Sequence, residues 1–444
     1  MPLFEKTALR DGVAPREAFA WALFDAANSG YSTVVLTAVF NAYFVSTVCA
    51  GADWATFVWS CAVAAANALS MAIMPAVARA ADLTAGKKAW LAAATLLCVA
   101  ATALLSLSGP GTYVLSAALV IVSYIGFNVG ESLNSAFLPE IARPEALGKV
   151  SGWGWSLGYA GGLVTLALCL TVVLIGQKNG VSEDTLVAAS NIITAAVFLV
   201  VSLPVFAWLK ERAKPQVELR GLSVLKAVLR RPETTDTAEP RTLETLLAYP
   251  DFRRLVLCGF FYQCGVATVI TLAAVYASFV MGFTLTETLV MVLLVNITAA
   301  VGAFGFGYVQ DRIGHKSALA ATLVLWLAMV ATAAMAETRA VFWIAANLAG
   351  LAMGSSQSAG RALVAVFAPE KALARFYGIW NMALWLSAVI GPITYGAVTW
   401  ISGNNQRLAI VVTGLFFAAG LATLIALDVE RGRKLALGVN ERTD

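Results

Sequence analysis

Long runs of apolar residues alternate with short polar segments along almost the whole chain. About 20 predominantly apolar residues let a helix cross the hydrocarbon core of a bilayer. Runs of that order cover residues 20–48, 54–78, 88–108, 112–138, 150–176, 188–209, 252–280, 286–310, 317–336, 340–365, 375–401 and 407–427. The pattern predicts an all-α membrane protein with twelve transmembrane helices.

One long charged segment divides these helices into two sets of six. The predicted domains are an N-terminal bundle over 1–209, a cytoplasmic linker over 210–251, and a C-terminal bundle with a short cytoplasmic tail over 252–444. The fourth and tenth predicted helices both end in Pro-Glu, at Pro139 and Pro369. Such matching motifs indicate duplication, so we expect two pseudo-symmetric six-helix bundles.

The distribution of basic residues predicts the orientation of the chain. Charged residues make up 13% of the sequence, against about 25% in soluble proteins. With both termini in the cytoplasm, the outer loops hold only Lys178, Arg339 and Arg407 of the 30 lysines and arginines. This asymmetry follows the positive-inside rule. We expect a multi-pass protein of the bacterial inner (plasma) membrane, with the lipid bilayer and not nucleic acid as its partner.

Three ionisable side chains lie deep inside apolar runs: Asp25, Glu131 and Arg361. A charge at that depth costs about 2.5–3.5 kcal/mol on insertion scales unless it faces a partner or a wet cavity. Helical spacing puts each charge on a polar stripe. The stripes include Asn28 near Asp25, Tyr124 and Asn128 near Glu131, and Gln357 near Arg361. These stripes should face the protein interior or a cavity.

Glu131 and Arg361 occupy equivalent positions in the two repeats, because each precedes its Pro-Glu motif by two helical turns. We hypothesise that they face each other across a central cavity. An arginine fork suits a carboxylate and a carboxylate suits an ammonium, so the pair would bind a zwitterion such as an amino acid or short peptide. The alternative is a structural ion pair that locks one state of the protein.

Asp25 lies nearer the cytoplasmic end of its helix and has two interpretations. In the first interpretation, Asp25 carries a coupling proton, a role for which Glu131 is also a candidate. In the second, Asp25 caps the helix or pairs with a loop arginine. Tyr262, Trp380 and Asn381 are predicted to line the cavity wall, with core packing as the alternative. The lone His315 lies in a loop and is not expected to relay protons.

A repeated loop motif supplies a predicted latch between the bundles. Residues 307–316 read Gly-Tyr-Val-Gln-Asp-Arg-Ile-Gly-His-Lys, and a degenerate copy contains Asp82. The motif resembles the signature of the major facilitator superfamily. We expect Asp311 to accept hydrogen bonds from backbone N–H groups at a neighbouring helix end, with Arg312 and Lys316 holding the loop at the surface. Leu83 replaces the basic residue of the first copy, which predicts a weaker latch there.

A closer resemblance covers nearly the whole chain. The residues that carry it are Phe24 to Tyr31, Phe40 to Phe44, Asn134 to Glu140, Ser151-Gly152, Gly158 to Gly162, Gln357 with Arg361, and Gly391-Pro392. They are similar to the major-facilitator subfamily of autophagy-related vacuolar amino-acid effluxers and uncharacterised bacterial homologues. The resemblance implies solute transport. Two departures are Ala26, where the family has Trp, and residues 262–265, Tyr-Gln-Cys-Gly, which lack an expected acidic residue.

The predicted function is secondary-active transport of a small solute, an amino acid or short peptide, by alternating access, with protons as a candidate coupling ion. Two alternatives stay open: an exporter of amphipathic drugs or lipid-like compounds, and a non-transporting assembly or sensor protein. A primary pump is disfavoured, because the sequence has no G-x-x-x-x-G-K-S/T loop. An enzyme is not expected, because one His and scattered cysteines cannot build a metal or nucleophile site. No cofactor is predicted, and we expect a monomer.

Overall fold

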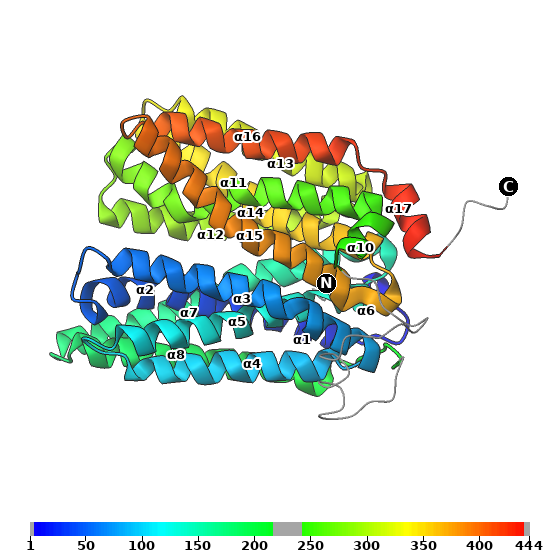
Figure 1. The fold of residues 1–444 in the computed structure, drawn as a ribbon, viewed down its shortest axis with the longest axis horizontal. Helices are drawn as coiled ribbons and strands as arrows, with labels where there is room; N and C mark the ends of the chain where they lie inside the picture. Colours follow the sequence, from blue (N-terminus) through cyan, green and yellow to red (C-terminus); the bar gives the residue numbers. More distant parts are fainter. Residues whose placement is uncertain (1–3, 216–241, 439–444) are drawn as a thin grey trace.

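The computed structural model describes residues 4–215 and 242–438. Within that part of the chain, helices form two bundles that lie side by side, with α1–α8 in one and α11–α16 in the other (Figure 1). The prediction of an all-helical membrane protein is therefore confirmed. Most of the predicted linker, residues 216–241, lies outside the described residues, so its boundaries stay a prediction.

The N-terminal bundle begins with a helix that changes its winding twice. After α1 (Pro15–Tyr31), π-helical turns at Ser32–Ala38 and Phe44–Val48 flank the short α2 (Phe40–Tyr43). The bundle continues through α3 (Ala55–Thr84), α4 (Lys87–Leu104), α5 (Tyr113–Ser135), α6 (Leu138–Ile141), α7 (Leu147–Lys178) and α8 (Glu183–Trp208). Such π segments often occur at functional sites, and these lie in the helix that contains Asp25.

The C-terminal bundle repeats this order. It contains α10 (Thr242–Ala248), α11 (Pro250–Met281), α12 (Leu285–Ile313), α13 (His315–Ala334), α14 (Arg339–Phe367), α15 (Leu373–Ile401), α16 (Gln406–Ile425) and α17 (Val429–Ala436). In the described residues, 11 segments are long and apolar enough to span a membrane. The predicted run 340–365 is helical as α14 but is not among them. Several serines and glycines of α14, and Arg361, are buried. These residues make the helix less apolar, and it tolerates them because protein rather than lipid covers these positions.

Two groups of helices join the bundles: α7 packs against α12 and α14, and α15 packs against α3 and α5. The pair of α7 and α12 is unusually close. A Cβ atom added to Gly307 would lie 2.7 Å from the carbonyl oxygen of Gly148, and one added to Gly152 would lie 2.5 Å from that of Ala303. Only glycine allows such an approach of two backbones. The glycines therefore set how tightly the bundles meet.

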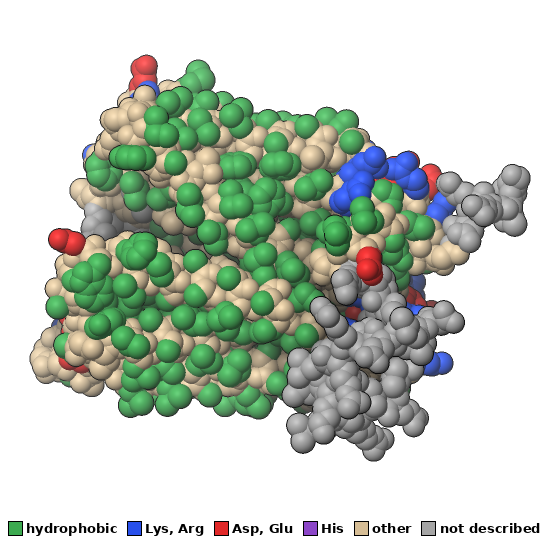
Figure 2. All heavy atoms as spheres, in the orientation of Figure 1, with side chains coloured by type: hydrophobic (Ala, Val, Ile, Leu, Met, Phe, Trp, Pro, Cys, Tyr) green, Lys and Arg blue, Asp and Glu red, His purple; other side chains and the backbone are tan. Residues whose placement is uncertain are grey.

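The two ends of the molecule differ in charge. We call one end the latch end and the opposite end the open end. The latch end contains residues 4–14, 82–87, 140–149, 209–215, 308–316 and 369–375. Glu17 binds Arg212 at the latch end, and Asp251 binds Arg431 in the equivalent place of the second bundle. Lysines and arginines gather near α17 at this end, while apolar side chains cover the bundle surfaces (Figure 2).

Candidate functional site

An ion pair between Asp25 of α1 and Arg361 of α14 crosses from one bundle to the other. Arg361 Nη1 donates to Asp25 Oδ2 at 2.6 Å. The Arg361 side chain is 5% exposed and that of Asp25 is 11% exposed. Both charges lie inside apolar helices, so each stabilises the other where water is scarce. The pair is therefore a buried polar contact that joins the two bundles.

Neighbouring side chains fix the guanidinium in place. Ser151 of α7 accepts from Arg361 Nε through its hydroxyl at 3.1 Å and from Nη2 through its carbonyl at 2.8 Å. The rings of Trp21 and Trp155 lie 4.7 Å and 5.3 Å from the guanidinium carbon. Asn134 Nδ2 donates to the remaining Asp25 oxygen at 2.9 Å. Both charges are therefore hydrogen-bonded as well as paired, which a buried pair needs to be favourable.

The structure corrects the predicted pairing of Glu131 with Arg361: the carboxylate bound to Arg361 is Asp25. Counting from the two prolines finds equivalent positions in the repeats, but equivalence does not make two side chains meet. Glu131 is half-buried and makes no hydrogen bond or ion pair with the described residues. Its carboxylate is therefore left available for another partner.

The other predicted site residues differ in whether their polar atoms have hydrogen-bond partners. Asn381 donates to the Tyr377 carbonyl in its own helix. Asn28 Oδ1 and the Tyr262 hydroxyl are buried without a hydrogen-bond partner in the described structure. Gln357 is half-buried on α14. Trp380 packs against Tyr262 with ring centroids 6.4 Å apart, so both aromatic rings belong at least partly to the core.

The predicted bonds of the latch aspartates are present. Asp311 accepts from the backbone N–H groups of Gly148 and Lys149, at 2.9 Å and 3.0 Å, where α7 begins. Asp82 accepts from Ala374 and Arg375, both at 2.9 Å, where α15 begins. Each carboxylate thus joins one bundle to a helix N-terminus of the other, where negative charge is favoured. The first copy makes as many of these bonds as the second, although we expected it to be weaker.

The basic residues of the motif do not cross between the bundles. Lys316 donates to the carbonyls of Ile425 and Leu427, within the C-terminal bundle. Arg312 is exposed. Sequence reasoning grouped these two residues with the aspartates because they share a motif, but only the aspartates bind the opposite bundle.

The N-terminal segment adds a strap over the latch end. Leu9 pairs with Ala142 in an isolated β-bridge, and Arg143 bonds the Leu9 carbonyl, both within the first bundle. Arg10 then reaches Glu370 of the second bundle at 2.9 Å. The segment therefore touches both sides of the closed end.

All these inter-bundle bonds lie at the latch end. At the open end, the recorded bonds of Tyr43 with Asp184 and of Arg339 with Glu287 stay within one bundle. A cleft between the bundles is visible there in Figure 2. The described structure is thus closed at the latch end and open at the other.

A cavity of about 280 Å³ lies between the bundles, nearer the helix midpoints. Its lining comes from α3, α5, α11 and α15, namely Val63, Asn67, Tyr124, Gln263, Val266, Ala267, Ile270, Thr271, Leu384 and Ala388. At a rise of 1.5 Å per residue, Asn67 is about 26 Å along α3 from the latch end, whereas Arg361 is about 9 Å from the latch end of α14. Along the helices, the ion pair therefore lies nearer the latch end than this cavity does.

Sequence reasoning found both charges of the pair but missed most of the surroundings. Ser151 and Asn134 were present in the family motifs, and Trp21 lies one turn before Asp25, so their signals were visible. Asn67 and Gln263 had no signal beyond being amides in apolar helices. In the described residues, no group of three or more His, Cys, Asp or Glu side chains could hold a metal ion.

The arrangement of two bundles around a central cavity is the fold of the major facilitator superfamily. The human organic anion transporter MFSD10 has a similar structure, with a TM-score of 0.69 at 15% identity over 93% of this chain and 99% of that chain. The fucose:proton symporter FucP of E. coli also has a TM-score of 0.69, at 14% identity over 93% and 98% of the two chains. FucP has been crystallised in an outward conformation.

The family model for Atg22-like vacuole effluxers matches residues 41–437, and the chain belongs to this family of transporters, which are not enzymes. The uncharacterised MFS-type transporter YxiO of Bacillus subtilis is 24% identical over 95% of this chain and 97% of its own. Autophagy-related protein 22 of Yarrowia lipolytica is 23% identical over 72% of this chain. The match spans 57% of that fungal protein, so the activity of the whole fungal protein is not carried over directly.

Proposed function

We propose that this protein is a secondary-active transporter that moves an amino acid or short peptide by alternating access, with the Asp25–Arg361 pair as its gate at the latch end. The observation that carries the proposal is the position of this pair. It joins the two bundles and, along the helices, lies nearer the closed end than the central cavity does. In this proposal, a solute that leaves the cavity through the latch end passes the level of this pair.

Opening the latch end pulls Asp25 and Arg361 apart, because they belong to different bundles. A buried charge that loses its partner costs about 3–5 kcal/mol, so another group must take the partner's place. A zwitterion supplies both groups, since its carboxylate suits Arg361 and its ammonium suits Asp25. A proton on Asp25 is the other way to lower the cost of separation. The first route couples opening of the latch end to a bound solute, and the second couples it to a bound proton.

Glu131 is the second candidate for coupling. It is half-buried, lies on α5 of the same bundle as Asp25, and has no bond to the described residues. A carboxylate without a partner inside the protein suits an ammonium group or a proton. We propose that Glu131 holds the ammonium group of the solute or a coupling proton while the latch end is closed.

We propose the bacterial inner membrane as the location, with the latch end and both termini in the cytoplasm. The support is the excess of lysine and arginine at the latch end, which the positive-inside rule assigns to the cytoplasmic side. The protein would act as a monomer, because the cavity is built from two bundles of one chain.

The test is transport by the purified protein in liposomes, using amino acids and short peptides with and without a pH gradient. Asp25→Asn should reduce transport at least about 10-fold, since it removes the charge that holds Arg361. Asp53→Asn, an exposed loop change at the open end, is the matched control and should leave transport unchanged. Full zwitterion transport by Arg361→Ala would exclude the gate.

Two further variants separate the roles of the charges. The swapped double variant Asp25→Arg/Arg361→Asp should recover transport if the pair only gates, and should not if the pair also orients the solute. Glu131→Gln should remove the response to a pH gradient if Glu131 carries the proton.

Export of amphipathic compounds is the second candidate function. It is favoured by the cavity lining, in which Val63, Val266, Ile270 and Leu384 are apolar and no charged residue takes part. The pairing of Arg361 with Asp25 also leaves less free charge for a zwitterion. Transport of lipophilic dyes in the same liposomes, with no transport of amino acids, would support this alternative.

A further inference from the structure

The guanidinium group of Arg361 belongs to the second bundle but is held entirely by the first. Within the described residues, its hydrogen bonds and ring contacts all come from α1 and α7, through Trp21, Asp25, Ser151 and Trp155. We call these four residues the guanidinium socket. When the bundles separate at the latch end, the socket stays with the first bundle and the group that fills it leaves with the second.

The socket matches the shape of a guanidinium as well as its charge. Nε and Nη2, which form one edge of the planar group, both donate to Ser151, while Nη1 donates to Asp25. The indole rings of Trp21 and Trp155 lie within 5.3 Å of the guanidinium carbon. A flat, delocalised cation uses both the edge acceptors and the rings, whereas a compact ammonium group has neither a planar edge nor a face.

Hydrogen bonds inside the first bundle hold part of the socket without Arg361. Trp21 Nε1 donates to the carbonyl oxygen of Asn134 on α5 at 2.8 Å. Asn134 Nδ2 in turn donates to Asp25 Oδ1 at 2.9 Å. Neither bond involves the second bundle, so Trp21 and Asp25 keep their relative positions when Arg361 withdraws. The emptied socket is therefore preorganised for another guanidinium.

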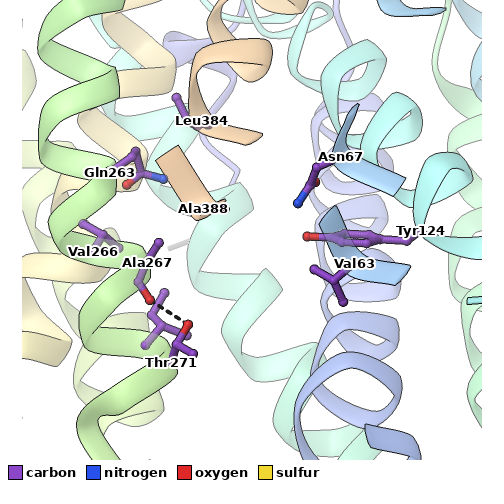
Figure 3. A pocket seen from close by; sticks show the side chains of 10 residues that line it. Val63, Asn67, Tyr124, Gln263, Val266, Ala267, Thr271, Leu384 and Ala388 are labelled. Carbon is purple, nitrogen blue, oxygen red and sulfur yellow. Dashed lines mark hydrogen bonds between the residues drawn. The ribbon is translucent and has the colours of Figure 1, made fainter. Parts of the chain in front are cut away.

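The central cavity offers no equivalent place for a cation. Figure 3 shows Asn67 and Tyr124 on one wall of this cavity and Gln263 and Val266 on the other. No Asp or Glu is among the residues that line it. A cationic group there would lose its water without gaining an opposite charge. A positively charged part of a solute is better served by the socket.

The charges inside the membrane also favour a cationic solute. Asp25, Glu131 and Arg361 sum to −1 when all three are ionised. A neutral zwitterion leaves this sum unchanged, whereas arginine, with two cationic groups and one carboxylate, brings it to zero. Buried charge is least costly when it is balanced. In this arrangement Asp25 takes the guanidinium, Glu131 the ammonium group and Arg361 the carboxylate.

We propose that the socket is the subsite for a guanidinium group of the transported solute, and that Arg361 fills it as an internal competitor while the latch end is closed. The inference rests on the proposed transport of amino acids or short peptides and narrows it. A guanidinium has two sources in that class, free arginine and the arginine residue of a short peptide.

The test is equilibrium binding of arginine, alanyl-arginine, lysine and citrulline to the full chain in detergent. Citrulline has the length of arginine but a neutral ureido group in place of the guanidinium. Arginine or alanyl-arginine should bind at least about 10-fold more tightly than citrulline and lysine, because the hydrogen bonds of the guanidinium are charge-assisted. The tighter of the two identifies the source. Citrulline or lysine binding as tightly as both guanidinium ligands overturns the inference.

Competition with Arg361 has its own signature. Asp311→Ala removes latch bonds far from the socket, so Arg361 leaves the socket more often and arginine should bind about 10-fold more tightly than to the wild type. Arg312→Ala, an exposed change in the same motif, should leave the affinity unchanged. An unaltered affinity for arginine in Asp311→Ala contradicts the competition.

Arg361→Ala empties the socket permanently. Methylguanidine at millimolar concentration should raise the melting temperature of this variant by at least about 2 °C and leave the wild type unchanged, because only the variant has a vacant socket. Methylurea, which is neutral and of similar shape, should have no effect, and Asp25→Asn/Arg361→Ala should lose the response. A folded Arg361→Ala that ignores methylguanidine overturns the inference. If the variant does not fold, the comparison of arginine with citrulline on the wild type decides alone.

Trp155→Leu removes one ring of the socket and should weaken arginine binding about 5-fold. Trp400→Leu makes the same change at a side chain that is 85% exposed, and should alter nothing. Equal arginine binding by the Trp155 and Trp400 variants would exclude Trp155 and contradict the socket.

Binding and transport fail separately. If liposomes move no amino acid or peptide but arginine binding shows these preferences, the proposed function fails and the subsite stands. If other amino acids or peptides move and guanidinium ligands have no advantage, only this inference fails.

Discussion

At the latch end, Asp25, Asp82 and Asp311 each reach from one bundle to a charge or backbone N–H group of the other, whereas the recorded bonds at the open end stay within a bundle. The comparison shows that the closed end is held largely by directional polar contacts. The backbone bonds of Asp82 and Asp311 exchange with water at a small net cost, so these two contacts can open and reform. Deep apolar packing of the same area would be harder to reverse.

The largest predicted effect comes from removing the central cation of the closed end. Arg361→Ala leaves Asp25 buried without its partner, which should cost about 3–5 kcal/mol and abolish transport. Thermal unfolding in detergent measures the loss. The double variant Asp25→Asn/Arg361→Gln should unfold closer to the wild-type temperature, because neither charge is then left unpaired. A single variant as stable as the wild type would mean that the pair is not buried as described.

The next effect comes from the two latch aspartates. Asp82→Ala or Asp311→Ala removes two bonds to helix N-termini, and each change should weaken closure of the latch end by about 1.5–3 kcal/mol. Spin labels at Gln177→Cys and Ile401→Cys, both exposed at the open end in different bundles, report the shift. With exposed Cys61 replaced by serine, the label distance should shorten.

The same measurement compares the two copies of the motif. Equal numbers of bonds predict equal shifts for Asp82→Ala and Asp311→Ala. Arg312→Ala serves as the control, because Arg312 is exposed and should leave the distance unchanged. A much smaller shift for Asp82→Ala would instead support the weaker first latch that the sequence predicts.

A smaller effect tests the space around the ion pair. A Cβ atom at Gly154 would lie 2.5 Å from Arg361 Nη2 and from Asp25 Oδ2, so Gly154→Ala should destabilise the protein by about 1–3 kcal/mol through overpacking. Gly305→Ala on α12 is the matched change, since its Cβ would have no neighbour within 4 Å. Thermal unfolding of the two variants should differ clearly, and identical melting temperatures would show that the pair moves aside freely.

The smallest effect belongs to the strap over the latch end. Arg10 and Glu370 are 37% and 75% exposed, so Arg10→Ala should cost no more than about 1 kcal/mol. Because exposed pairs are screened by salt, the difference between variant and wild type in melting temperature should vanish at high ionic strength. A loss that persists in high salt would show that the strap contributes through packing rather than charge.

Prediction from sequence succeeded where local rules apply. The lengths of the apolar runs predicted the helices. The repeated motif identified Asp82 and Asp311 as carboxylates that bind helix N-termini. The free-energy cost of burying a charge identified Asp25 and Arg361 as residues that need a partner inside the protein. Prediction failed for their pairing, because it used the repeat to match Glu131 with Arg361. A repeat relates positions by rotation and says nothing about which side chains meet at the axis.

By itself, the sequence determined that this chain is a helical membrane protein of two related halves with three costly charges inside, since hydrophobic length and charge burial are properties of single helices. Only the tertiary structure decided that Asp25 is the partner of Arg361, that Glu131 stays free, and that Asn67 and Gln263 share a cavity. Those facts depend on the rotation and depth of helices far apart in the chain, which are set by how glycines and side chains pack between the bundles.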